Sequence, residues 1–291
     1  MTSAVEDMAV KVSRGRIYPW DFDRKGKLPV WTFLNRMEFL GSSQQLFFKA
    51  DNDIKDIKQA IASLKQAMAY ELRFVRCQSV QFSPDFSELM TFPGRAIRVE
   101  AKVIFVGKTS WVYETKILDQ TTERELANRH VQTVNIDKKT RRPKPLPDWV
   151  TERYSHLTSR PRPTTVQTFD LSDAEPAFVY PVTVAPSDID ANMHTNQSQY
   201  ARYCFNCAAT GAKKGAYSII SGDLLDYDVI SVDLLYQKES REGDSLRVES
   251  WEDAKEPDTL KFQVKRGEDN ILQCRMRFRI PSVPDIEKAK L

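Results

Sequence analysis

The sequence holds 291 residues, of which 41% are hydrophobic and 29% charged, and its formal net charge is +3. A chain of this length is expected to form about two domains, because one domain usually spans about 100 to 200 residues. The small net charge does not favour nucleic acid as a partner, and no apolar run approaches the roughly 18 residues that cross a bilayer. The composition therefore predicts an ordinary soluble protein and excludes nucleic-acid-binding and membrane-spanning classes.

The amino-terminal residues and the cysteines bear on the cellular compartment. Residues 1–16 lack the hydrophobic core of a secretory signal, and Glu6 and Asp7 are not typical of a transit peptide. The four cysteines are spread along the chain and do not form a disulfide framework. Cys204 and Cys207 form a CxxC pair inside a helical pattern, which favours buried packing residues over a zinc or redox site. We expect a reduced, cytoplasmic protein with no cofactor or bound metal.

The first half of the chain predicts one helix followed by four strands. Asp53 is a candidate cap for a helix whose apolar residues recur at three- and four-residue steps. Strands are predicted at residues 70–82, 95–106, 111–118 and 125–136, and alternation in the second strand predicts one buried face. The helical apolar residues are Ile54, Ile57, Ile61, Leu64 and Met68. The alternating strand residues are Ile97, Val99, Ala101, Val103 and Phe105.

The second half repeats this order. A strand is predicted at residues 177–184 and a helix at 196–211, with Gly211 as its stop. Four strands follow at 228–238, 245–251, 259–265 and 271–280. The residues expected on one helix face are Tyr200, Cys204, Cys207 and Ala208. The last strand alternates Leu272, Cys274, Met276, Phe278 and Ile280 with polar residues.

Residues 138–165 separate the two halves and are rich in proline and arginine. Closely spaced prolines resist both helices and strand pairing, so we predict an extended connector in which His156 is structural or exposed. The prolines are Pro143, Pro145, Pro147, Pro161 and Pro163. The expected organisation is therefore a first domain at 1–137, a linker at 138–165 and a second domain at 166–291.

Residues 187–200 combine carboxylates, amides and one of the three histidines of the chain. Asp190, Asn192 and His194 stand at positions i, i+2 and i+4, which in an extended segment places three polar side chains on one face. The same residue types are also typical of a polar loop that caps the next helix. The spacing by itself leaves both interpretations open.

The order Ser-Asp-Ile-Asp-x-Asn-x-His-x-Asn, with a tyrosine in the predicted helix that follows, resembles the active-site segment of the acyl-ACP thioesterases, a family of paired hotdog domains. Residues 235–246 look like that family's Tyr-Arg-Arg-Glu segment and the Gly-Asp turn after it. The resemblance is clear over about residues 178–278. It implies an α+β fold of two tandem hotdog domains, each a curved antiparallel sheet wrapped around a central helix.

This resemblance implies hydrolysis of a fatty acyl thioester to a free fatty acid and a thiol, in lipid metabolism. The catalytic set would be Asp190, Asn192, His194 and Glu239. Asp190 or Glu239 would serve as nucleophile or base, His194 as proton shuttle and Asn192 as orienter or oxyanion donor. Without the second motif, Glu239 would be a surface carboxylate at a strand end. Candidate substrate-binding residues are Asn196, Tyr200, Phe47 and Met68, the last two in an acyl-chain pocket of the first domain.

The sequence departs from the family pattern after the second motif begins. Gln237 and Lys238 replace two arginines that plant members usually carry, and Ser240 stands where a cysteine is frequent. The partner would be an acyl carrier protein or coenzyme A thioester, and monomer and homodimer are both compatible with a hotdog pair. The alternatives are a hotdog hydratase or dehydratase and a non-catalytic acyl-binding protein.

Overall fold

The computed structural model describes residues 11–40, 72–90, 96–163, 166–171 and 174–281. The predicted helix at 54–68, with Phe47 and Met68, lies outside them. The chain divides into two compact units. Of the described residues, unit one holds 11–15, 37–40, 72–78 and 96–163, and unit two holds 16–36, 79–90, 166–171 and 174–281. No helix of the described ranges is long and apolar enough to span a membrane.

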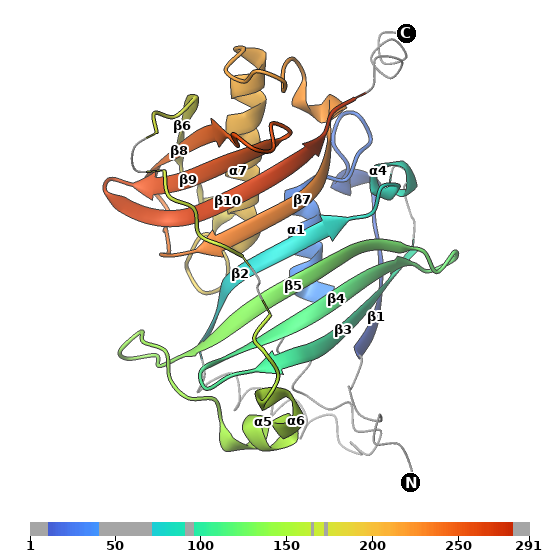
Figure 1. Cartoon of the computed structure of the whole chain (residues 1–291), viewed down its shortest axis with the longest axis vertical. Coiled ribbons are helices and arrows are strands. Elements are labelled where there is room, and N and C mark those ends of the chain that lie inside the picture. The colour runs from blue at the N-terminus through green and yellow to red at the C-terminus, as the bar shows by residue number, and fades with distance from the viewer. Residues whose placement is uncertain (1–10, 41–71, 91–95, 164–165, 172–173, 282–291) are drawn as a thin grey trace. The chain divides into compact units, whose positions relative to one another are not determined.

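Unit one is built on three long antiparallel strands, β3 (Ala96–Val106), β4 (Ser110–Asp119) and β5 (Glu125–Ile136). β1 (Lys11–Arg16) neighbours β3, and the start of β2 (Leu72–Phe82) neighbours β5 (Figure 1). The predicted buried face of β3 holds as far as Val103. Phe105 is only half-buried, because the β3–β4 register shifts between Val103 and Phe105 and Val106 is buried in its place.

The prolines predicted an extended connector, but the connector is not extended throughout. Residues after Pro147 form two short helices, α5 (Asp148–Arg153) and α6 (Ser155–Thr158). Their apolar residues lie with Trp111 and other buried residues in the core of unit one, so burial outweighs the local effect of the prolines. The connector residues in that core are Leu146, Val150, Tyr154 and Leu157. His156 is exposed.

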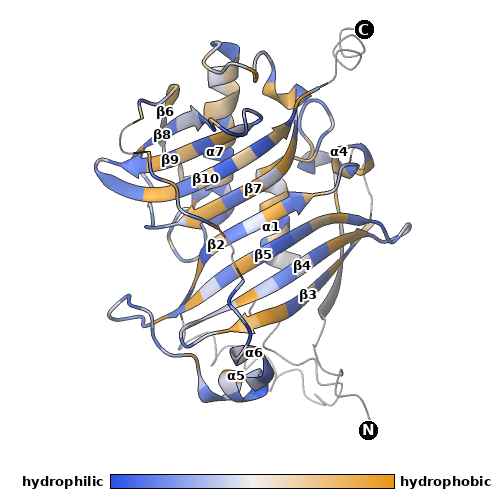
Figure 2. Ribbon diagram, in the orientation of Figure 1, coloured by the Kyte–Doolittle hydropathy of each residue, from blue (hydrophilic) through white to orange (hydrophobic). Residues whose placement is uncertain are grey.

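Unit two contains a curved antiparallel sheet in the order β7-β10-β9-β8-β6. Its strands are β6 (Phe178–Thr183), β7 (Asp228–Tyr236), β8 (Ser245–Glu252), β9 (Thr259–Arg266) and β10 (Asp269–Arg279). Hydrophilic and hydrophobic residues alternate along β9 and β10 (Figure 2). Leu272, Cys274, Met276 and Phe278 are buried as predicted, whereas Ile280 lies beyond the strand and is 40% exposed.

Helix α7 (Gln197–Lys213) crosses behind this sheet and contacts β6, β8, β9 and β10 (Figure 1). Its predicted apolar face is fully buried. Gly211 is not the stop, since the helix continues to Lys213. The chain leaves the helix at Gly215, whose φ is +69°, and the Ala216 and Gly215 N–H groups donate to the Gly211 and Ala212 carbonyl oxygens. This pattern is a Schellman motif, which uses glycine for its left-handed backbone.

The remaining helical elements are short. They are η1 (Pro19–Asp21), α1 (Val30–Leu40), α4 (Phe86–Leu89), η2 (Pro186–Asp188) and η3 (Leu224–Asp226). Within unit two, Phe33 of α1 packs edge-on against Phe82 and Phe86, with ring centroids 5.1 and 5.6 Å away. These aromatic contacts attach the start of α1 to the end of β2.

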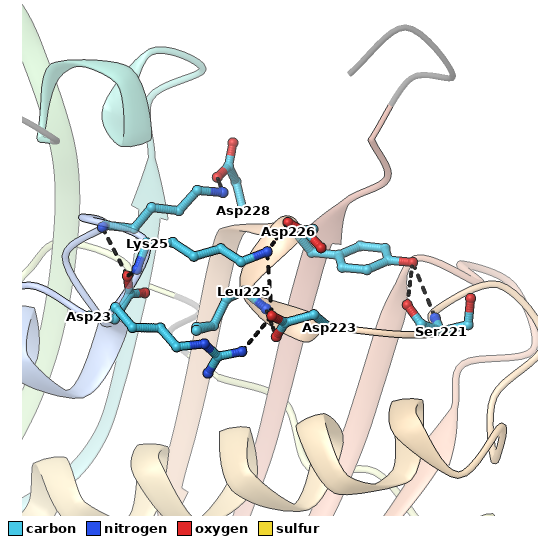
Figure 3. Close-up of polar contacts among 10 residues, drawn as sticks. Asp23, Lys25, Ser221, Asp223, Leu225, Asp226 and Asp228 are labelled. Atoms are coloured by element: carbon cyan, nitrogen blue, oxygen red, sulfur yellow. Dashed lines mark hydrogen bonds and ion pairs between the residues drawn. The ribbon is translucent and has the colours of Figure 1, made fainter. Parts of the chain in front are cut away.

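An ion-pair cluster holds the loop before α1 against η3 and β7 (Figure 3). Arg24 and Lys25 contact Asp223, and Lys25 also contacts Asp226. Lys27 lies 2.8 Å from Asp228 at the start of β7. The hydrogen bond to Asp226 is the main cause that raises the pKa of Lys25. Because these groups are partly exposed, the cluster stabilises unit two as a network, and each pair contributes little by itself.

Candidate active site

The candidate site of unit two begins with a tight loop between η2 and α7. The Asn196 N–H donates to the Asp188 carbonyl at 2.8 Å, and the Asp190 N–H donates to the His194 carbonyl at 2.9 Å. Met193, at the exposed tip, adopts a φ of 63°. Residues 190–194 are therefore a closed turn and not an extended segment. Asp190, Asn192 and His194 do not lie on one face of an extended segment, as their spacing had predicted, because local hydrogen bonds of the Asp and Asn residues favour a turn.

The side chain of Asp188 attaches this loop to the first turns of α7. Its carboxylate is buried, accepts the Ala185 N–H at 3.0 Å and the Tyr203 hydroxyl at 2.6 Å, and pairs with Arg202. Burial, together with the hydrogen bond to Asp188, raises the pKa of Tyr203. A buried carboxylate with a guanidinium and two further donors is well satisfied. The first turns of α7 therefore hold the loop in one place.

His194 lies beside Glu239, which follows the end of β7. His194 Nε2 is 2.9 Å from Glu239 Oε2, and the two side chains are 15% and 32% exposed. His194 Nδ1 is buried and has no hydrogen-bond partner among the described residues. With Nε2–H donated to the carboxylate, the neutral imidazole keeps its basic lone pair on Nδ1. The arrangement is a carboxylate-oriented imidazole able to exchange a proton.

The residues that follow His194 and Glu239 join the two segments. Thr195 N–H donates to the Ser240 carbonyl at 2.9 Å, and the Thr195 and Ser240 hydroxyl oxygens are 2.7 Å apart. The Tyr200 hydroxyl lies 2.8 Å from Ser240 Oγ and accepts the Ser240 N–H at 3.1 Å. Burial raises the pKa of Tyr200. Sequence reasoning missed the roles of Thr195 and Asp188; for Thr195, the presence of a hydroxyl residue directly after both His194 and Glu239 was a usable signal.

Asp190 and Asn192 lie in the same loop as His194. One Asp190 carboxylate oxygen accepts the Asn192 N–H at 2.7 Å, and the Asn192 side chain is exposed. The structure therefore brings His194 and Glu239 into contact. Asp190 and Asn192 are linked to each other within the loop.

The four candidate substrate-binding residues have different positions. The Asn196 side chain caps α7, accepting the Ser198 N–H at 2.8 Å, and the Gln199 N–H donates to the Asn196 carbonyl. Tyr200 is 3% exposed and bonded to Ser240. Two N–H groups of the first helical turn are thus engaged in the cap. Phe47 and Met68 lie outside the described residues.

A separate pocket of unit two is lined by the loop before α1, the end of β2 and the start of β7, and includes Trp31, Phe86 and Phe205. Lys27 and Asp228 of its lining also belong to the ion-pair cluster, and Asp23 of the lining accepts the Lys25 and Lys27 N–H groups beside it (Figure 3). None of the four candidate catalytic residues lines it.

The CxxC pair lies in the buried face of α7. Burial raises the pKa of Cys204, and it raises the pKa of Cys207 to about 12. Both thiols therefore remain protonated near neutral pH and are poor metal ligands. Among the described residues, no cluster of three His, Cys, Asp or Glu side chains is arranged to hold a metal ion.

Comparison with known proteins adds a sequence match and a fold. Residues 67–154 match the family model of the thioesterase-like superfamily. No curated protein sequence matches the chain.

Three solved structures cover nearly the whole chain, each at 16% identity. A Lactobacillus plantarum protein assigned as an oleoyl thioesterase has a TM-score of 0.72, over 95% of this chain and 99% of its own. The 12:0-ACP thioesterase of Umbellularia californica has 0.69, over 94% and 98%. An acyl-ACP thioesterase of Bacteroides thetaiotaomicron has 0.66, over 93% and 98%. The chain therefore carries a thioesterase-like signature over residues 67–154 and has the hotdog-like fold of the acyl-ACP thioesterases, as the two motifs predicted.

Proposed function

We propose that this protein is a thioesterase that hydrolyses a fatty acyl thioester, carried by an acyl carrier protein or coenzyme A, to a free fatty acid and a thiol. The observation that carries the proposal is the 2.9 Å contact between His194 Nε2 and Glu239 Oε2. The two residues come from two separate motifs, and the fold that joins them is shared with thioesterases. The two units would be two tandem hotdog domains, with the acyl-chain pocket in the first.

The proposed chemistry needs a nucleophile, a proton acceptor and donors for the oxyanion. The Glu239 carboxylate orients the His194 ring. Substrate binding must then admit a water molecule to His194 Nδ1, which is buried in this structure, and Nδ1 removes a proton from that water as its oxygen attacks the acyl carbonyl. The carbon–sulfur bond then breaks, and the imidazolium returns the proton to the leaving thiolate. Asn192 would donate to the oxyanion, and Asp190 would hold the loop or act as an alternative base. No metal or cofactor is required for this cycle.

The proposal is tested by free-thiol release from acyl-ACP and acyl-CoA substrates of varied chain length. We expect His194→Ala and Glu239→Ala to lower kcat by about 100-fold or more, the usual contribution of general acid–base catalysis. Each variant is checked for folding by circular dichroism and thermal unfolding. The preferred substrates also identify the carrier and the chain length.

The chain offers a matched control in unit one. His130 Nε2 lies 3.6 Å from Glu114 Oε1 across β4 and β5, so the chain has a second histidine–glutamate pair outside both motifs. We expect His130→Ala to leave kcat unchanged. If the wild type releases no thiol from any substrate, the thioesterase proposal falls. An altered but intact thioester would then indicate a hydratase or dehydratase, and tight acyl binding without turnover would indicate a binding protein.

A further inference from the structure

Ser240 is the centre of a buried hydrogen-bond network that no catalytic role accounts for. Ser240 is 0% exposed, and its two partners Thr195 and Tyr200 are 6% and 3% exposed. Its backbone and side chain make five contacts with them, between 2.7 and 3.1 Å. Ser240 lies outside helices and strands, so these contacts, and not a regular element, determine its position.

One assignment of the hydroxyl protons satisfies every contact. The Ser240 N–H donates to the Tyr200 oxygen, and the Tyr200 hydroxyl donates to Ser240 Oγ. Ser240 Oγ then donates to Thr195 Oγ1, and Thr195 Oγ1 donates to the Ser240 carbonyl. Each hydroxyl donates once and accepts once, so the network has one complete arrangement.

We propose that Ser240, held between Tyr200 and Thr195, is a positioning residue that sets the distance between Glu239 and His194. Ser240 directly follows Glu239, and Thr195 directly follows His194, so the bonds between them bring the two preceding side chains together. Tyr200 belongs to α7, so its bonds to Ser240 also hold Ser240 in place relative to this helix. The inference rests on the proposed function for its kinetic consequence, while its structural consequence stands apart from activity.

A second contact supports the same segment. Arg266 of β9 donates to the Glu239 carbonyl at 3.3 Å and pairs with Asp244 at 2.7 Å. This bond restrains the Glu239 backbone, and Arg266 otherwise pairs with Asp244 and Asp269, which do not belong to the His194 loop. The Ser240 network is the part that connects the two loops, so its removal is expected to loosen the catalytic pair without releasing Glu239 completely.

The test variant is Ser240→Ala, which removes the hydroxyl contacts with Thr195 and Tyr200. We expect kcat to fall about 10- to 100-fold with little change in KM, since a misplacement of about 1 Å has this effect on catalysis. Ser240→Cys retains a weak donor and acceptor and is expected to recover part of the loss. Thr195→Val removes the same connection from the other loop and is a second variant if Ser240→Ala does not fold.

Unit two contains a matched control. Ser250 is also 0% exposed, and its Oγ lies 2.7 Å from the Tyr217 hydroxyl. Neither residue is adjacent to Glu239 or His194 in the chain. Ser250→Ala therefore removes a buried serine–tyrosine bond of the same kind. We expect a comparable loss of thermal stability and no change in kcat. If Ser250→Ala lowers kcat as much as Ser240→Ala, general destabilisation explains the effect and the positioning role is rejected.

Two measurements show whether Ser240 acts through Glu239. In a Glu239→Gln background, Ser240→Ala is expected to change kcat by less than about twofold, because the group that it positions is already lost. In nitrogen NMR at one pH, the His194 Nε2 signal is assigned by its absence in His194→Ala. Ser240→Ala should move this signal toward its position in Glu239→Gln. Ser250→Ala should not move it.

The NMR comparison separates the two proposals. If the wild type hydrolyses no thioester but the His194 signal moves as expected, the proposed function fails and the positioning role stands. An unmoved His194 signal in both Ser240→Ala and Thr195→Val overturns the positioning role, whatever the activity.

Discussion

His194 Nε2 lies 2.9 Å from Glu239 Oε2, although each residue belongs to a loop and not to a helix or strand. The first loop precedes α7 and the second follows β7. Their contact is maintained by the bonds between Thr195 and Ser240, the residues that come next in the chain. The candidate catalytic pair is therefore a product of loop-to-loop hydrogen bonding on a scaffold of one sheet and one helix.

The charge of Glu239 is expected to matter more than its size. Glu239→Gln preserves the side-chain volume and an oxygen acceptor, but removes the charge that stabilises a protonated His194. We expect kcat to fall about 100-fold and KM to change little, because the charge stabilises the protonated imidazole more than the neutral one. Steady-state kinetics with the preferred thioester measures both constants. Glu114→Gln in unit one is the control, and a large rise in KM with unchanged kcat would contradict this role.

The Asn196 cap is expected to contribute to stability. The Asn196 carboxamide accepts the N–H and the hydroxyl of Ser198, so Asn196→Ala should lower the free energy of unfolding by about 1 kcal/mol. Asn196→Asp keeps the accepting oxygen and should retain most of the stability. Urea unfolding followed by tryptophan fluorescence measures the difference. If the amide also binds substrate, Asn196→Asp will raise KM at unchanged stability, and equal stability of the alanine variant would refute the cap.

Gly211 is expected to resist substitution despite its helical position. A Cβ at this residue would lie 2.6 Å from the hydroxyl oxygen of Tyr217 and 2.8 Å from two of its ring carbons. Tyr217 is buried and bonded to Ser250, so it cannot move freely. Gly211→Ala should therefore lower the free energy of unfolding by about 1 to 3 kcal/mol, as overpacking does, and outweigh the helix preference of alanine. Adding Tyr217→Ala should abolish most of that penalty; additive losses in the double variant would disprove the steric explanation.

The carboxyl group of Asp233, on β7, is expected to make the stability of the protein depend on pH. Burial raises its pKa, and the hydrogen bond from Ser79 and the charge of Arg275 offset this only in part. The pKa of Asp233 in the folded protein is higher than its unfolded value of about 3.9. Its contribution to stability is therefore fully present below the unfolded pKa and is lost as the pH rises through the folded pKa. Asp233→Asn removes the ionisation and should raise the melting temperature at pH 7 relative to the wild type, with no difference near pH 3.

Asp253 is the control, because its pKa is shifted in the opposite direction. Burial works against its ionisation, but hydrogen bonds from the Lys255 N–H and from Lys261 outweigh burial and lower its pKa. Its contribution to stability is therefore present above the unfolded pKa and lost as pH falls, so Asp253→Asn should be less stable than the wild type at pH 7. Thermal unfolding of both variants over a pH series checks the two signs. If both substitutions changed the stability at pH 7 in the same direction, the result would contradict these local charge environments.

The sequence by itself determined the long strands and the apolar face of α7. The predicted strands at 125–136 and 245–251 match β5 and β8 closely, because alternation between apolar and polar residues requires only one buried face. The predicted face of α7 follows from the same logic at the helical period. The resemblance of the two motifs led to the catalytic roles of Asp190, Asn192, His194 and Glu239, which stay a prediction.

The tertiary structure decided everything that depends on contacts between distant segments. The helices after Pro147 depend on packing against Trp111 and other residues of unit one, so the local proline pattern did not predict them. The turn at 190–194 and the end of α7 at Gly215 are instead made by local hydrogen bonds that the spacing of residue types did not reveal. The His194–Glu239 distance, by contrast, depends on contacts between distant segments. Backbone and hydroxyl groups of Thr195, Tyr200 and Ser240 set that distance, and only folding brings these groups within hydrogen-bond range.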